Sequence, residues 1–361
     1  SGMWYTVGVG LLRKELMWMK SKNRRKIFSA VFYLAVLAVT LYYVFNDKNL
    51  GEILSLLSEA NLGDVAVAVC AVVAFILGES VVLRYLLGKL GAKVSFGHCS
   101  LFSFIGFFYS AITPSASGGQ PMQVLYMRRD GIPAGVSTVV LAIVTITYKM
   151  VLVLIGLAVM LLRPPAVMAC LQGVEGVIYL GMALNVVAIS LLLMAVFLPG
   201  PLEKCVEWVL RMIQKIRPFR NPQQVAQRVD GSLSQYRGTA SFFKKEPLVI
   251  LVVFLITFVQ RFCLFSVVWF TYRAFGLTGQ NPVTVSLLYG MISVAVDMLP
   301  LPGGMGISET LFSSIFLPIF GAELVLPGMI LCRGISYYTQ LLISAIMTVA
   351  AHLVFRKKDS K

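Results

Sequence analysis

Charged side chains are scarce in this sequence. Only 13% of the 361 residues are Asp, Glu, Lys or Arg, whereas 58% are hydrophobic and the mean hydropathy is +0.83. So few polar side chains cannot cover the surface of a soluble domain of this length. The composition therefore excludes a soluble globular protein and predicts an all-α integral membrane protein with several spanning helices.

Motifs of soluble enzymes and of nucleotide-driven pumps are also missing. The sequence contains no GxxxxGK[ST] phosphate-binding loop, no HExxH pair and no GxSxG turn. Its two histidines, His98 and His352, lie near predicted membrane boundaries, and its six cysteines are scattered without a CxxC motif. We therefore expect no ATP hydrolysis, no metal site, no disulfide framework and no cofactor.

Acidic residues are fewer than basic ones, 16 against 31, which gives a net charge of +15. This excess could indicate nucleic-acid binding, but the basic residues flank apolar runs and do not cluster on a polar face. Nucleic acid is therefore not an expected partner. Most basic residues fall on one side of the predicted topology, so that side is assigned to the cytoplasm together with both termini.

Apolar runs long enough to span a membrane occur at six places. They lie near residues 27–45, 65–86, 134–162, 174–198, 248–272 and 328–352. Two further apolar segments, 96–127 and 283–320, are too long for one pass and are interrupted by Pro, Gly and Ser. We interpret each as a re-entrant hairpin of two half-helices, because broken backbone inside a bilayer persists only where protein or a water-filled cavity satisfies it.

The two hairpins enter from opposite sides in this topology. Residues 65–162 form a span, a hairpin and a span, and residues 248–352 repeat that order with the opposite orientation. Such an inverted repeat is typical of carriers. Residues 27–361 are expected to form a single transmembrane domain. The basic stretch 1–26 is expected to lie along the cytoplasmic membrane surface, with no removable signal peptide.

A cytoplasmic insert, 203–247, is predicted to contain two amphipathic helices separated by Pro218 and Pro222. Their apolar faces consist of Val206, Val209, Ile213 and Ile216 in the first helix and of Val225, Val229, Leu233 and Tyr236 in the second. We expect both helices to lie on the anionic inner leaflet. Binding of a protein partner is the alternative.

Six ionisable residues remain inside the predicted membrane segments. They are Glu79, Lys149, Arg261, Asp297, Glu309 and Arg333. Such residues face the protein interior or a cavity, where they serve function or pair with one another to hold helices together. Arg261 and Arg333 are the stronger binding candidates, because both lie in spans that bracket the second hairpin. A guanidinium also suits bidentate phosphate binding and keeps its proton in an apolar phase.

The remaining four residues allow several interpretations. Glu79 and Lys149 both fall in the first repeat, where a structural ion pair between them is plausible. Asp297 and Glu309 flank the second break and could neutralise the arginines, bind a cationic headgroup or carry a coupling proton. The sequence does not choose among these roles.

Each hairpin contains a predicted helix start in the middle of an apolar segment. Unpaired N–H groups and the positive end of the helix dipole favour an anionic group at such a start. The alternative for the glycines is close helix packing. Together with the arginines, the binding candidates are Ser115, Ser117, Gly118, Gly119, Gly303, Gly304, Gly306 and Ser308.

Three segments carry a resemblance to a known family. They are Pro114-Ser-Ala-Ser-Gly-Gly-Gln-Pro121 with Met127-Arg-Arg-Asp-Gly-Ile132, Leu301-Pro-Gly-Gly-Met-Gly-Ile-Ser-Glu309, and Arg333-Gly-Ile-Ser-Tyr-Tyr338. In this order they resemble the lysylphosphatidylglycerol synthase transmembrane family. The resemblance implies a bacterial cytoplasmic-membrane protein that moves lipid-linked substrates between leaflets, with the motif residues lining the path. Gln120 and Gln123 stand where many members carry an acid and a base, so both are binding candidates and a different headgroup preference is expected.

The expected function is a flippase or scramblase for a phosphate-bearing membrane lipid, of the aminoacyl-phosphatidylglycerol or polyprenyl-phosphate type. The sequence shows no counterpart of the soluble acyltransferase domain of the full-length synthases, so lysyltransferase activity is not expected. One alternative is a membrane-embedded lipid-modifying transferase that uses Asp297 or Glu309 as its base. Another is an accessory subunit whose charges are structural. A homodimer is left open.

Overall fold

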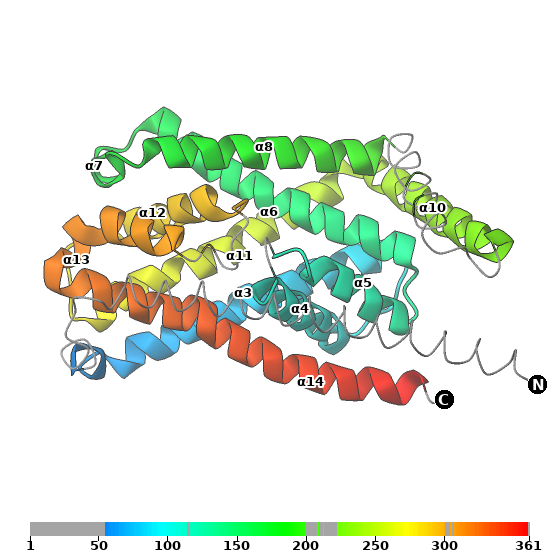
Figure 1. The fold of residues 1–361 in the computed structure, drawn as a ribbon, viewed down its shortest axis with the longest axis horizontal. Coiled ribbons are helices and arrows are strands. Elements are labelled where there is room, and N and C mark those ends of the chain that lie inside the picture. The colour runs from blue at the N-terminus through cyan, green and yellow to red at the C-terminus, as the bar shows by residue number, and fades with distance from the viewer. Residues whose placement is uncertain are drawn as a thin grey trace, which may run out of the picture. The chain divides into compact units, whose positions relative to one another are not determined.

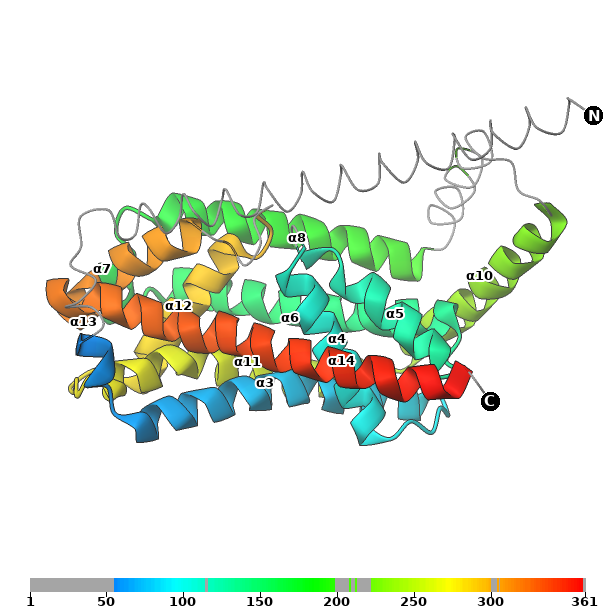
Figure 2. The same ribbon diagram turned by 60° about the horizontal axis from the view of Figure 1, so that its bottom comes forward.

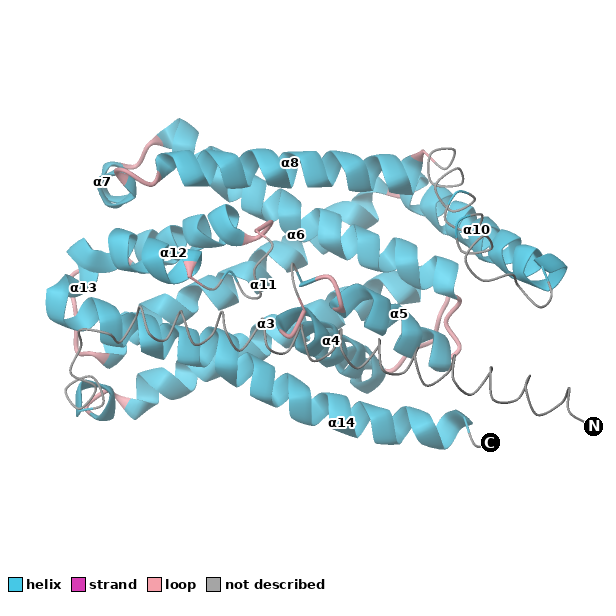
Figure 3. Ribbon diagram, in the orientation of Figure 1, coloured by secondary structure: helices cyan, strands magenta, loops and turns pink. Residues whose placement is uncertain are grey.

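Helices make up the regular structure of the described part of this chain. The computed structural model describes residues 55–113, 116–198, 208, 212, 222–299, 304 and 306–359. Within these ranges there are helices and loops but no strand (Figure 3). The predicted surface stretch 1–26, the predicted span 27–45 and the first amphipathic helix of the insert lie outside the described residues, apart from residues 208 and 212.

Five helical stretches in the described ranges are long and apolar enough to cross a membrane. They are α3 (Leu62–Lys89), α6 (Ala134–Leu162), α8 (Glu175–Phe197), α11 (Pro247–Ala274) and the continuous stretch Ile307–Phe355. The first four coincide with the predicted spans at 65–86, 134–162, 174–198 and 248–272. The chain is therefore an all-α integral membrane protein. A short helix, α7 (Pro165–Leu171), connects α6 to α8.

The fifth stretch has 49 residues, which is too long for one straight pass across a bilayer. It consists of α13 (Ile307–Arg333), a π-helical segment η3 (Gly334–Thr339) and α14 (Gln340–Asp359). Gly321 interrupts α13, because its φ of 75° and ψ of 169° are not helical. Figures 1 and 2 show the chain reversing direction within α13 before it continues through α14.

Each broken apolar segment forms two helices around a non-helical break. Helices α4 (Phe96–Ala111) and α5 (Gly119–Arg129) flank the first break and pack against each other. Helices α12 (Pro282–Val296) and α13 do the same around the second. Both views show α5 and α12 extending in opposite directions along the helix bundle (Figures 1 and 2).

Side-chain hydrogen bonds and one close backbone approach shape the first break. The Thr113 hydroxyl donates to the Tyr109 carbonyl at 2.6 Å and accepts from the Gly118 N–H at 2.9 Å, so it holds the turn closed. A Cβ on Gly119 would lie only 2.1 Å from Ser110 Oγ. Glycine at this position therefore allows the start of α5 to press against α4.

The first helices of the two predicted repeats, α3 and α11, pack along each other. A Cβ on Gly78 would lie 2.7 Å from Gln260 Cγ, and Gln260 Nε2 donates to the Phe75 carbonyl at 2.9 Å. The glycine lets the two apolar helices approach closely. The hydrogen bond to the Phe75 carbonyl satisfies the Gln260 amide between them. The site described below lies beside this interface, because Glu79 follows Gly78 and Arg261 follows Gln260.

The second helix of the insert is observed as α10 (Pro222–Lys245), and it packs against α6, α8 and α11. The Tyr236 hydroxyl donates to the Ala195 carbonyl at 3.0 Å, and burial raises the pKa of this hydroxyl. Gly135 makes the contact possible, because a Cβ there would lie 2.3 Å from the Ser232 carbonyl oxygen. Tyr236, Ala240 and Phe243 are buried. Of the four residues of the predicted apolar face, Tyr236 therefore packs against protein and does not rest on the leaflet.

Candidate functional site

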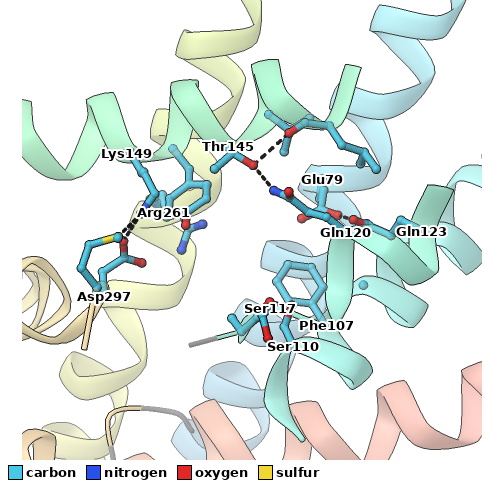
Figure 4. Close-up of a pocket in the computed structure, with 16 residues that line it drawn as sticks. Glu79, Phe107, Ser110, Ser117, Gln120, Gln123, Thr145, Lys149, Arg261 and Asp297 are labelled. Carbon is cyan, nitrogen blue, oxygen red and sulfur yellow. Dashed lines mark hydrogen bonds and ion pairs between the residues drawn. The ribbon is translucent and has the colours of Figure 1, made fainter. Parts of the chain in front are cut away.

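A cavity of about 380 Å³ lies where the first break faces α3, α6 and α11 (Figure 4). Its polar and charged lining residues are Glu79, Ser110, Ser117, Gln120, Gln123, Thr145, Tyr148, Lys149, Arg261 and Asp297. A second cavity of about 250 Å³ is lined by the second break and by α13 and η3. Ala116, Arg261 and Asp297 line both cavities, so the two breaks meet around these residues.

Arg261 lies over two aromatic rings. Its guanidinium carbon lies 4.4 Å from the ring centroid of Tyr148 and 5.1 Å from that of Phe75, distances at which a cation is attracted to a ring face. Arg261 Nε is buried and has no hydrogen-bond partner, and Arg261 forms no ion pair within the described ranges. A buried donor left in this state costs about 1–3 kcal/mol. The guanidinium is therefore positioned to bind an anionic ligand.

Arg333 is paired. Its Nε and Nη2 bind Glu309 Oε1 at 2.9 and 2.7 Å. The other carboxylate oxygen, Oε2, accepts from the Gly306 N–H at 2.6 Å and from the Ser308 hydroxyl at 2.9 Å. Of the roles left open for Glu309, the structure shows neutralisation of an arginine. The same carboxylate occupies the start of α13, where the sequence predicts an anion site.

Lys149 binds Asp297, which lies at the end of α12 in the second predicted repeat. Lys149 Nζ lies 2.5 Å from Asp297 Oδ2 and 3.2 Å from Asn185 Oδ1. Lys149 therefore pairs with Asp297 and not with Glu79, the partner that the sequence made plausible. The end of α12 brings Asp297 to Lys149, whereas Glu79 Oε1 accepts a hydrogen bond from Gln123 Nε2 at 2.7 Å.

The two glutamines of the first hairpin are anchored to different helices. Gln123 is 4% exposed, and its Nε2 also donates to the Phe102 carbonyl at 3.2 Å. Gln120 Nε2 donates to the Thr145 hydroxyl on α6. Both amides line the first cavity, where they supply hydrogen-bonding groups without net charge.

The other predicted residues divide into two groups. Ser117 lines the first cavity, and Gly304 and Ser308 line the second. Gly118 and Gly119 instead shape the turn and the contact with α4, as the close-packing alternative predicts. Gly306 is the N-cap residue of α13, has a φ of 86°, and donates its N–H to Glu309. Ser115 and Gly303 lie outside the described residues.

Sequence reasoning missed Tyr148 and Thr145, which line the first cavity with Lys149. A signal for them was present. Thr145, Tyr148 and Lys149 have the i, i+3, i+4 spacing that places side chains on one helical face, so a cation in a membrane helix marks its neighbours as candidates. Tyr289 and Ser336, which line the second cavity and hydrogen-bond to each other at 3.1 Å, gave no comparable signal.

The fold and the site define a class: a multi-pass helical membrane protein with charged residues around internal cavities at two helix breaks. Residues 30–344 match the family model described as the lysylphosphatidylglycerol synthase TM region, and the chain belongs to this family. A UPF0104 membrane protein of Archaeoglobus fulgidus is 24% identical over 303 residues, covering 81% of this chain and 88% of that protein. One of Pyrococcus horikoshii is 24% identical over 257 residues, covering 68% and 74%.

Proposed function

We propose that this protein is a flippase or scramblase that moves a phosphate-bearing lipid between the leaflets of a cytoplasmic membrane. The observation that carries the proposal is Arg261, a guanidinium that lies over two rings and lines both cavities, with a buried Nε that has no hydrogen-bond partner in the described part of the chain. Membership of a family named for a lipid synthase supports a lipid substrate.

The two helix pairs act as re-entrant hairpins in this proposal, one entering from each side of the bilayer. Both termini are cytoplasmic. The lipid headgroup enters between the two breaks, where Arg261 binds the phosphate and Ser117 and Gln120 add hydrogen bonds, while the acyl chains stay in the bilayer. Contact with the rings of Phe75 and Tyr148 holds the guanidinium in place, and its N–H groups suit bidentate binding of a phosphate.

Because the neighbouring cations are paired with acids, Arg261 is the cation that is available to bind the lipid phosphate. Arg333 is neutralised by Glu309 and Lys149 by Asp297, so neither cation is available without breaking an ion pair. The same pairing engages both acids that a transferase would use as a base, which favours transport over chemical modification. The Lys149–Asp297 pair joins α6 of the first repeat to the second break, and its rupture would let the two repeats move apart.

A lipid-transport assay tests this function. Purified protein is reconstituted into vesicles containing a fluorescent phosphatidylglycerol, and the fraction of fluorophore that a membrane-impermeant reductant can reach is followed over time. Wild-type protein is expected to bring inner-leaflet lipid to the outer face. Arg261→Ala is expected to lower the rate about tenfold to a hundredfold, since a hydrogen bond to a charged group contributes roughly 1.5–3 kcal/mol.

Arg273→Gln is the matched control. Arg273 lies on the same helix, its side chain is 51% exposed, and it pairs with Asp64 at 3.3 Å, a surface pair of small energetic value. This variant is expected to keep the wild-type rate. A wild-type rate equal to that of empty vesicles, or equal rates for wild type and Arg261→Ala, would overturn the proposal.

A further inference from the structure

An open groove of about 790 Å³ lies outside the two cavities, where α3 ends and α4 begins. It is lined by Val81, Arg84, Tyr85, Gly88, Lys89 and Phe96. Two of these residues are cations and none is an acid. The groove lies at the end of a helix long and apolar enough to cross the membrane.

Within the described part of the chain, neither cation has an acidic partner. Arg84 is exposed and makes no hydrogen bond or ion pair with any residue described here. Lys89 is also exposed, and its Nζ lies over the ring of Tyr85 at 5.5 Å from the centroid. Arginine and lysine beside an aromatic ring at the end of a spanning helix are typical of the membrane interface. Their charge complements a phosphate there.

Two other lining residues of the groove are apolar and exposed. Val81 is 42% exposed and Phe96 is 37% exposed. Val81 precedes Lys89 by eight residues, which places it about 12 Å further along the helix axis toward the bilayer interior. A molecule that matches both the cations and the apolar residues of the groove has a negative headgroup and a hydrocarbon chain.

We propose that this groove binds an anionic phospholipid of the leaflet at the α3 C-terminal end, separately from the transported lipid. The headgroup phosphate contacts Arg84 and Lys89, and one acyl chain lies along Val81 and Phe96. The lipid bridges the end of α3 and the start of α4. It therefore steadies the helix that carries Glu79 against the first arm of the hairpin.

Gly88 provides a direct test. A Cβ at this position would meet no atom within 4 Å, so a side chain can be added here, and Gly88→Leu is chosen to fill the groove. The full chain is placed in phosphatidylcholine nanodiscs containing a phosphatidylglycerol with a photoreactive diazirine on its acyl chain. After illumination, cross-linked peptides are identified by mass spectrometry. A phosphatidylcholine with the same diazirine is used in a parallel sample.

We expect the phosphatidylglycerol probe to label the peptide spanning residues 81–96. In Arg84→Gln this labelling should fall about fivefold, because one basic residue contributes about 1 kcal/mol to the binding of an anionic lipid. Gly88→Leu is expected to abolish it. Lys93→Gln, which removes an exposed charge outside the groove, leaves it unchanged.

Equal labelling by the two probes, or full labelling of Gly88→Leu, would overturn the proposal. Labelling of a co-purified peptide or protein in place of residues 81–96 would also overturn it. Because cross-linking is measured without transport, the groove and the proposed function can fail independently.

Discussion

At the scale of single residues, the site depends on a difference between two arginines that look alike in the sequence. Arg261 and Arg333 both lie in apolar helices beside the second break. Arg333 forms two short hydrogen bonds to Glu309, whereas Arg261 lies over the rings of Phe75 and Tyr148 and has a buried Nε without a hydrogen-bond partner among the described residues. A paired guanidinium holds a structure together, and a stacked one with free N–H groups is available to a ligand.

Tyr148 is expected to contribute to headgroup binding through Arg261. Replacing its ring by an aliphatic side chain in Tyr148→Leu removes one face of the stack. We expect the lipid concentration at half-maximal transport to rise roughly threefold to thirtyfold, matching about 0.5–2 kcal/mol for a cation–π contact. Tyr148→Phe keeps the ring and should behave as wild type, because the hydroxyl has no hydrogen-bond partner within the described ranges. Equal loss in both variants would show that the hydroxyl, not the ring, matters.

At the scale of helices, much of the architecture could be predicted from local sequence. Four spans follow from the length of their apolar runs, and both breaks follow from Pro and Gly inside such runs. The pairing of Lys149 with Asp297 could not be predicted, because it depends on which helix end lies beside α6 in the folded chain. The packing of α10 could not be predicted either, because the sequence pattern of an apolar helix face is the same whether lipid or protein covers that face.

The contact between α4 and α5 gives a prediction at this scale. Gly119→Ala would place a Cβ 2.1 Å from Ser110 Oγ and 2.6 Å from the Gly106 carbonyl oxygen, and backbone oxygen cannot move aside cheaply. We expect the unfolding free energy to fall by about 1–3 kcal/mol, the usual cost of overpacking, seen as a lower Tm in detergent.

Gly97→Ala is the control for this change. Gly97 lies in α4 of the same hairpin, and a Cβ there meets no atom within 4 Å. Its Tm should be unchanged or slightly higher, since Ala is favoured over Gly in a helix. A Gly119→Ala variant as stable as Gly97→Ala would mean that the two helices do not pack as closely as the structure shows.

At the scale of the whole molecule, the account requires the two hairpins to enter from opposite sides of the membrane. Reporter fusions test this orientation. A fluorescent protein that matures only in the cytoplasm is expected to fluoresce when fused after Lys361. A phosphatase that is active only outside is expected to be active when fused after Gln172, between α7 and α8. The reverse pattern would show that the protein has the opposite orientation in the membrane. Equal signals from both fusions would contradict the assignment of Lys361 and Gln172 to opposite sides.

The central claim is that a lipid phosphate binds to Arg261 between the two breaks. An experimental structure of the protein in nanodiscs containing phosphatidylglycerol tests it most directly. The account predicts a phosphate within about 3 Å of the Arg261 guanidinium nitrogens, with Arg333 still bound to Glu309. Lipid phosphate seated against Arg333 alone, with Arg261 buried in protein contacts away from any headgroup, would contradict it.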